Sequence, residues 1–115
     1  MLYYKKKLNE RKNLKLVILC GLLMTNIMFA TDFIIDQKDK TFIPHKIVAK
    51  VGDTITFRNS DPFAHNAYTD DENNEFDIGI QSPGSDITVN IRAAGDFNIE
   101  CAIHPNMLLE VKVIK

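Results

Sequence analysis

The sequence predicts an all-β domain, a β-sandwich or barrel, for residues 31–115. Two observations lead to this prediction. Apolar residues after residue 31 recur with a period of two over short runs, and no stretch shows the helical period of 3.6. Turn-forming residues separate these runs from one another. Regular short strands with turns between them are typical of sandwiches and barrels.

Five runs are expected to form strands that each bury one apolar face. They are 46–51 (KIVAKV), 54–58 (TITFR), 86–92 (DITVNIR), 96–101 (DFNIEC) and 109–113 (LEVKV). In the first run Ile47, Ala49 and Val51 share the inward face. Turn signals lie at 52–53, 59–62, 82–84 and 95–96, and the polar segment 70–74 (DDENN) predicts a solvated loop.

Residues 1–30 are of a different kind. Six Lys or Arg residues and one acid precede the apolar run LVILCGLLMTNIMFA, residues 16–30. This is the pattern of a secretory signal, and the run is shorter than the roughly 20 residues of a membrane span. We therefore expect cleavage after Ala30 and export to the periplasm, although Met28 is large where a small residue is preferred. The alternative is an uncleaved segment that anchors the domain to the membrane.

Cleavage would leave one small domain, residues 31–115, which we expect to be monomeric and not inserted in the membrane. The full chain has a formal net charge of −1. The domain alone carries eight Lys or Arg and fourteen Asp or Glu, a net charge of −6. An acidic domain is a poor nucleic-acid binder. Every other Cys and Met precedes residue 31, so Cys101 and Met107 are unique in the domain and no internal disulfide can form.

The segment CAIHPNM, residues 101–107, gathers three soft or borderline donors with the spacing C-x2-H-x2-M. Cys101 is in phase with inward apolar residues, so it should point into the sandwich, with His104 and Met107 in the loop that follows. His65 comes just after a strand and a turn and can reach the same pole. Two imidazoles, a thiolate and a weak axial thioether are the donor set of blue copper sites. The pattern predicts one copper ion bound by His65, Cys101, His104 and Met107.

Two other interpretations compete with copper binding. A lone Cys is often a small buried hydrophobic residue, and a lone Met often fills a gap. Nucleophilic catalysis by Cys101 and His104 would need an orienting third residue and a substrate cleft, neither of which the sequence indicates. Three donors within seven residues favour a metal site over both. His45, which follows Pro44, is interpreted as a surface histidine.

The chain resembles the cupredoxins of the plastocyanin type, most of all amicyanin and its relatives. The resemblance rests on FIPHKIVAKVGDTITFRNSD (42–61), HN (65–66), SPG (82–84) and GDFNIECAIHPNM (95–107). It implies a Greek-key β-sandwich and the same four copper ligands. It also implies that Asn66 braces the ligand loop by hydrogen bonding and that electrons pass through His104, the exposed ligand.

Two departures from the family pattern stand in this chain. Ala102 and Ile103 lie between Cys101 and His104, where amicyanin has a Pro, and we expect this difference to alter the stiffness of the loop and the reduction potential. Leu109 stands where the family usually has a Gly, which leaves the path of the final strand open.

The resemblance implies a type 1 copper protein, not an enzyme, that carries single electrons between redox partners of the cytochrome or dehydrogenase type. The domain's negative charge favours partners with a basic patch. Two alternatives use the same ligands: a copper carrier or copper-homeostasis module without redox turnover, and a module that serves the assembly of a larger enzyme.

Overall fold

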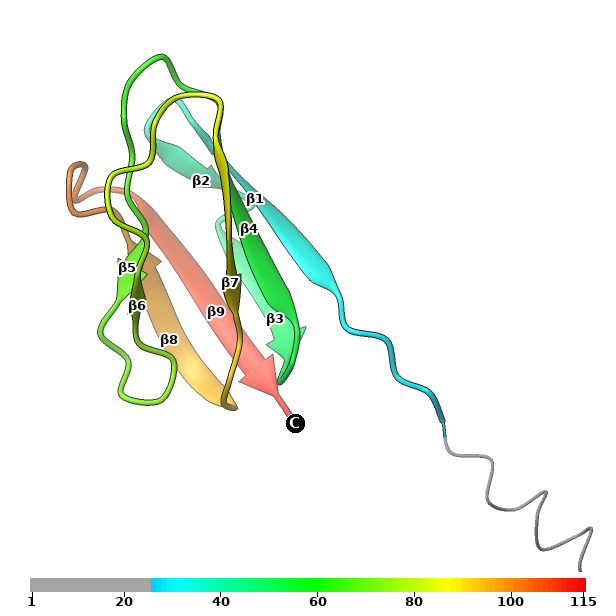
Figure 1. The fold of residues 1–115 in the computed structure, drawn as a ribbon. Coiled ribbons are helices and arrows are strands. Elements are labelled where there is room, and N and C mark those ends of the chain that lie inside the picture. Colours follow the sequence, from blue (N-terminus) through cyan, green and yellow to red (C-terminus); the bar gives the residue numbers. More distant parts are fainter. Residues whose placement is uncertain (1–25) are drawn as a thin grey trace, which may run out of the picture.

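The structure is a computed structural model that describes residues 26–115. Residues 1–25, and with them most of the predicted signal segment, lie outside the described part. Within residues 26–115 the chain forms strands and no helix (Figure 1). The strands are β1 (Asp32–Lys38), β2 (Thr41–Ile43), β3 (Lys46–Lys50), β4 (Thr54–Asn59), β5 (Tyr68–Thr69), β6 (Phe76–Asp77), β7 (Asp86–Asn90), β8 (Gly95–Glu100) and β9 (Leu108–Ile114).

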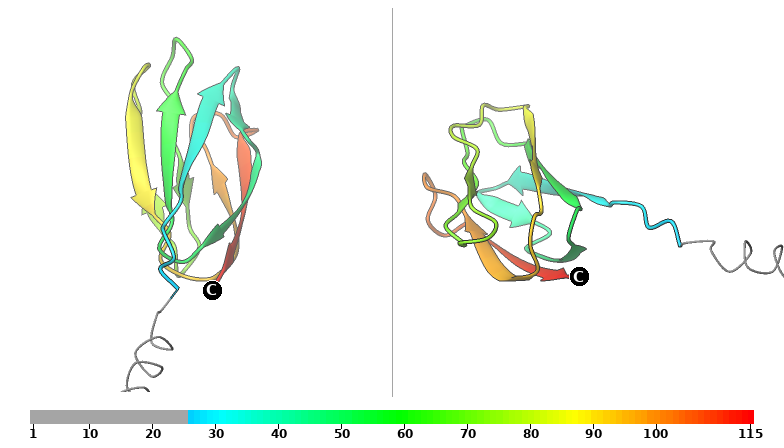
Figure 2. Two further views of the ribbon diagram at one scale, coloured as in Figure 1. Left: turned by 90° about the vertical axis from the view of Figure 1, so that its right-hand side faces the viewer. Right: turned by 60° about the horizontal axis from the view of Figure 1, so that its bottom comes forward.

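These strands form two sheets that lie against each other as layers (Figures 1 and 2). One sheet has the strand order β2-β1-β4-β7 and the other has the order β3-β9-β8-β5-β6. β1 pairs in parallel with β4, and β3 pairs in parallel with β9, while the remaining neighbours are antiparallel. The predicted all-β sandwich is confirmed.

Apolar side chains from both sheets fill the space between the layers. β9 alternates strictly, with Leu109, Val111 and Val113 buried and the residues between them exposed. Its register sets Leu109 opposite Ile99 of β8. The buried apolar residues are Ile35, Phe42, Ile47, Ala49, Ile55, Phe57, Ala67, Ile91, Ile99, Cys101, Met107, Leu109, Val111 and Val113. The core therefore continues into the pole where Cys101 and Met107 lie.

The five predicted strands are confirmed as β3, β4, β7, β8 and β9, with ends shifted by one or two residues. The final strand is regular at Leu109, where the family usually has a Gly, and the side chain of Leu109 is buried within β9. The prediction that Val51 shares the inward face of β3 is wrong. β3 ends at Lys50, and Val51 is exposed in the turn, where its N–H donates to the carbonyl of Ile114 at 3.1 Å.

The prediction of a wholly solvated loop at 70–74 is also wrong. Asn74 is only 3% exposed. Its Oδ1 accepts the N–H groups of Arg92 and Ala93 at 3.0 and 3.1 Å, and its Nδ2 donates to the carbonyl of Ala93 at 3.1 Å. Asn74 thus ties this loop to the segment between β7 and β8, a role that polar composition alone does not reveal.

The loop between β8 and β9 lies at one end of the sandwich, and the C-terminus lies at the other (Figure 1). Residues 26–30 extend away from the sandwich before β1 begins (Figures 1 and 2). The described residues include no helix long and apolar enough to cross a membrane.

Candidate metal centre

The predicted ligands come from two loops at one pole of the sandwich. His65 follows β4, and its backbone N–H and C=O form an isolated bridge with Gln81 at 3.0 and 2.8 Å. Cys101 follows the last residue of β8, and His104 lies in the turn before β9. Because β8 and β9 are paired along their whole length, this short loop has fixed ends. The fold therefore brings His65 close to Cys101 and His104, which follow it by 36 and 39 positions in the sequence.

His65, Cys101 and His104 form a group whose ligand atoms all lie within 4.8 Å of one another. The two imidazoles face each other through Nδ1, with 3.2 Å between these nitrogens, and Cys101 Sγ lies 3.8 Å from Nδ1 of His104. Two donors that each lie about 2.0–2.3 Å from one ion are at most about 4.6 Å apart, and the separations of 3.2 and 3.8 Å are below this limit. The group is thus close enough to bind a single metal ion.

Cys101 lies in an almost closed environment. Its side chain is 2% exposed, and its Sγ accepts the backbone N–H of Asn66 at 3.3 Å. A cysteine binds a metal through its sulfur, as the thiolate. The sulfur therefore faces both the amide of Asn66 and Nδ1 of His104.

Asn66 braces the two ligand loops against each other, as the resemblance implied. Its Oδ1 accepts the N–H of Ala102 at 3.0 Å. Its Nδ2 donates to Oδ1 of Asp77 at 2.8 Å and to the carbonyl of Gly79 at 2.9 Å. Asn66 is 4% exposed, so these bonds are shielded from water. The side chain of Asn66, the residue after His65, therefore binds the backbone of Ala102, the residue after Cys101.

His65 is held from its other side by Asp61, a residue that the sequence analysis did not single out. Nε2 of His65 lies 2.6 Å from Oδ2 of Asp61. Burial would raise the pKa of Asp61, but the hydrogen bonds from His65 and from the amides of Lys40 and Asp39 outweigh it, and the pKa is lowered. An ionised carboxylate only accepts, so Nε2 carries the proton and Nδ1 keeps its lone pair toward the cluster.

The turn between β1 and β2 supports this carboxylate. The N–H of Asp39 donates to Oδ1 of Asp61 at 2.8 Å, and that of Lys40 donates to Oδ2 at 3.1 Å. Both turn residues have a positive φ, 54° and 57°. This left-handed conformation, tolerated best by short polar residues, points their amides at Asp61. The sequence carries no distinct signal for Asp61, because an Asp in a turn is common.

Phe63 lies against both histidines. Its ring centroid is 5.3 Å from that of His65 and 5.6 Å from that of His104. Lys40 Nζ lies 5.4 Å from the centroid of the same ring. His104 itself is half-buried, and its pKa is lowered first by burial and then by its electrostatic interactions with His65 and Lys40. A neutral imidazole is the form that binds a metal.

Met107 is buried at the same pole, with 1% of its surface exposed. Its N–H donates to the carbonyl of His104 at 3.0 Å, which closes the turn between them. The metal-binding group described above contains three of the four predicted ligands. The assignment of Met107 as the fourth, axial ligand stays a prediction.

His45 is exposed, which agrees with its interpretation as a surface histidine. It nevertheless lies near the ligand loop, because it lines a pocket of about 350 Å³ together with Asn106 and Met107. It does not belong to the metal-binding group found among residues 26–115.

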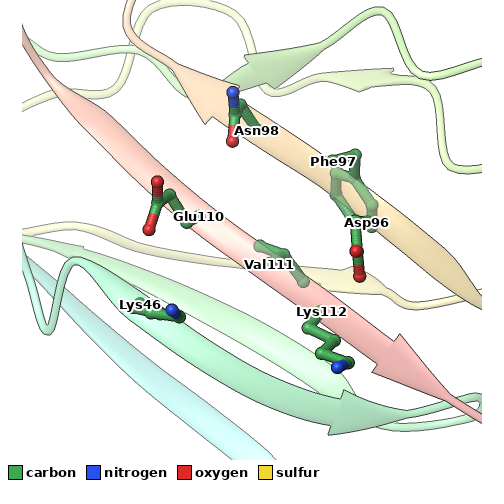
Figure 3. Close-up of a pocket in the computed structure, with 7 residues that line it drawn as sticks. All are labelled: Lys46, Asp96, Phe97, Asn98, Glu110, Val111 and Lys112. Atoms are coloured by element: carbon green, nitrogen blue, oxygen red, sulfur yellow. The ribbon is translucent and has the colours of Figure 1, made fainter.

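A second groove, of about 470 Å³, lies on β3, β8 and β9 (Figure 3). Lys46 and Lys112 alternate there with Asp96 and Glu110. None of the residues that line it is a Cys or His. Its mixed charges are typical of the solvated face of a sheet, and it shares no residue with the metal-binding group.

The fold and this donor set define the class of the protein as a cupredoxin-type metal protein. A family model described as copper binding proteins of the plastocyanin/azurin family matches residues 30–114. The chain therefore belongs to the plastocyanin/azurin family of copper-binding proteins. Copper is its cofactor, which agrees with the mixed imidazole and thiolate donors. No curated protein sequence matches the chain.

Solved structures share the fold. A variant of amicyanin in the Cu(I) state is 18% identical, with a TM-score of 0.67 over 77% of this chain and 87% of that one. A purple cupredoxin from Nitrosopumilus maritimus is 22% identical, with a TM-score of 0.63 over 72% of this chain and 100% of that one.

A Cu-containing nitrite reductase from Thermus scotoductus SA-01 has the same fold within a longer chain. It is 20% identical with a TM-score of 0.68, and the match covers 81% of this chain but 24% of the reductase. This chain therefore spans about a quarter of that enzyme.

Proposed function

We propose that the chain is a type 1 copper protein that carries single electrons between protein partners. The observation that carries this proposal is the convergence of His65, Cys101 and His104, with a buried cysteine sulfur beside two imidazoles. Copper held by these residues, with Met107 as a further weak donor, would supply a one-electron Cu(I)/Cu(II) couple. A thiolate gives the strong electronic coupling that a carrier of copper ions does not need.

The polypeptide around the site supports fast electron exchange because it resists rearrangement. Asp61 fixes the ring of His65 from one side, and Asn66 joins the two ligand loops from the other. β8 and β9 hold the ends of the loop that bears Cys101 and His104. Four protein donors would also leave no open coordination position, which a catalytic metal site needs. These features favour an electron carrier over an enzyme.

The surface around His104 supports contact with a partner. His104 is half-buried at the end of the sandwich, and apolar residues border it: Ile103 is 47% exposed, Phe63 is 37% exposed, and Pro105 is exposed. We propose that this surface docks a redox protein and that electrons pass through His104. The net charge of −6 on residues 31–115 favours a partner with a basic patch.

Two measurements test the proposal. Electron self-exchange between the Cu(I) and Cu(II) forms is measured by NMR line broadening, and we expect fast exchange with little structural change. With a basic cytochrome as the probe partner, stopped-flow rates should fall as ionic strength rises. Slow self-exchange together with transfer of the copper ion to a chelating protein would favour the copper-carrier alternative instead.

A matched pair of variants tests the docking surface. Ile103→Asp, next to His104, should slow electron transfer to the cytochrome and leave the visible spectrum unchanged. Val48→Asp is the control, because Val48 is 54% exposed on β3 and lies in a strand rather than in the ligand loop. Equal rates for both variants would show that the surface around His104 is not the docking site.

Location and oligomeric state complete the proposal. We propose that the domain acts as a monomer in the periplasm, because residues 1–30 have the pattern of a secretory signal. Fractionation of the native host and size-exclusion chromatography of the purified protein test these two points.

A further inference from the structure

Thr31 is the residue at which the chain joins the sandwich. Its N–H donates to Oδ1 of Asp53 at 2.9 Å, and its carbonyl accepts the N–H of Thr54 at 3.0 Å. The described residues before it, 26–30, are all exposed. Among them Ile27, Met28 and Phe29 are 77%, 73% and 82% exposed. Ordered contacts with the domain thus begin at Thr31, and an apolar segment open to solvent precedes it.

Asp53 is a buried carboxylate whose paired cation, Lys50, lies on the side of Oδ2. It is 1% exposed, and its Oδ2 accepts the N–H of Lys50 at 2.8 Å. The ammonium of Lys50 is 3.5 Å from Oδ2, long for a charge-assisted bond, which is usually about 2.7–2.9 Å. The backbone of Asp53 is fixed as well, through Lys50 and Ile91. Among the described residues, Oδ1 has no such cation beside it and accepts only the N–H of Thr31.

We propose that export processing cuts the chain after Ala30 and that Asp53 then binds the new α-ammonium group of Thr31 as its ionic partner. Hydrolysis of the bond between Ala30 and Thr31 consumes one water molecule, gives Ala30 a carboxylate and gives Thr31 an amine. A free α-amino group has a pKa of about 7.7–8.0, so it is mostly protonated at neutral pH. The nitrogen already lies 2.9 Å from Oδ1, and no movement is needed.

The consequence is that processing stabilises the fold. An amide N–H bonded to a carboxylate becomes an ammonium bonded to the same carboxylate, and bonds between two charged groups are stronger than those with one. The cut also removes the exposed apolar residues 27–29. A cut one residue earlier would move the charge to Ala30, and a cut one residue later would remove the donor. The contact between Thr31 and Asp53 therefore specifies a cut at the peptide bond between Ala30 and Thr31. It does so whether or not the site binds copper.

The test uses the full chain, exported by a bacterial host, purified and loaded with copper. Intact mass locates the new N-terminus, which we expect at Thr31. A second full chain has one serine inserted between Ala30 and Thr31, so that a cut after Ala30 leaves the charge one residue away from Asp53. Urea unfolding should show a folding constant about fivefold lower for the insertion protein, the difference expected when one charge leaves a buried hydrogen bond.

Two variants complete the cycle. In Asp53→Asn the serine insertion should no longer change the folding constant. In Asp86→Asn, which removes an exposed carboxylate bound to Arg58, the fivefold difference should persist. Should Asp53→Asn fail to fold, a crystal structure of the exported protein decides the matter, with Thr31 nitrogen expected within hydrogen-bond distance of Oδ1 of Asp53.

Three results would overturn the proposal. These are a mass that retains residues 1–30 or starts at another residue, an insertion protein as stable as the processed chain, and a Thr31 nitrogen turned away from Asp53 in the crystal.

Discussion

Nε2 of His65 lies 2.6 Å from Oδ2 of Asp61, and the same carboxylate accepts two amides from the turn between β1 and β2. The edge of one sheet thus holds the imidazole whose Nδ1 faces Cys101 and His104. A carboxylate bonded to a ligand histidine fixes its tautomer and ring orientation and raises its basicity. Asp61 therefore acts on the copper through His65 as a positioning residue.

Asp61→Asn should raise the reduction potential and weaken copper binding. The negative charge of Asp61 stabilises Cu(II) more than Cu(I), so removing it raises the potential. Loss of such a hydrogen-bond partner of a ligand histidine typically costs about 10–100-fold in metal affinity. Voltammetry and competition with a chelator measure the two effects. Asp86→Asn removes an equal charge from the exposed pair with Arg58 and should change neither. Unchanged potential and affinity in Asp61→Asn would exclude this role.

Met107→Leu should keep a coloured Cu(II) site and raise the reduction potential. Leucine has nearly the same volume and fills the same buried space, where Met107 is 1% exposed. It has no sulfur, and loss of a weak axial donor destabilises Cu(II) more than Cu(I). Voltammetry of the wild type and the variant checks this. A potential that did not move would show that the thioether does not bind the copper.

Leu109→Ala should destabilise the copper-free protein by about 2–5 kcal/mol, because a large buried side chain is removed from a packed core. Leu109 is 0% exposed and lies opposite Ile99 in the pairing of β8 with β9. Leu108→Ala is the control, since its side chain is 41% exposed on the other face of β9, and it should cost less than about 0.5 kcal/mol. Urea unfolding measures both, and similar losses would argue against the described path of β9.

Asp53 should make stability depend on pH below pH 4. The N–H groups of Thr31 and Lys50 lower its pKa from the ordinary value of 3.8. A carboxyl group whose pKa is lower when folded stabilises the fold above its unfolded pKa, and this stabilisation is lost as pH falls through the folded pKa. Asp53→Asn should therefore be less stable than the wild type at pH 6 and closer to it at pH 2. Urea unfolding at both pH values measures this difference. An equal difference in stability between the two proteins at pH 6 and pH 2 would contradict the prediction.

Much of the fold could be predicted because its strands alternate cleanly. β9 and β8 carry apolar residues on one face only, and the phase of β8 also placed Cys101 inside. β1 escaped prediction because its inward face, Phe33, Ile35 and Gln37, includes a buried amide, while Ile34 is 43% exposed. β5 and β6 have two residues each, too few to show a period.

The ligand residues could be predicted because their chemistry is rare in this chain and their spacing is short. Asp61 and the buried Asn74 could not, since Asp and Asn are common in turns of every kind. Only the packing of one loop against another decides which of these polar side chains is buried and bonded. The contact of Asp61 with His65 depends on the turn at Asp39 and Lys40, which is distant in sequence.

The visible spectrum of the Cu(II)-loaded protein tests the central claim most directly. A copper ion bound by Cys101 between His65 and His104 should give an intense thiolate-to-copper band. Cys101→Ser should abolish that band, because an alcohol cannot replace the soft anionic ligand, and His65→Ala should weaken or reshape it. His45→Ala should leave it unchanged. A band that survives in Cys101→Ser, or that is lost in His45→Ala but kept in His65→Ala, would contradict the assignment of this site.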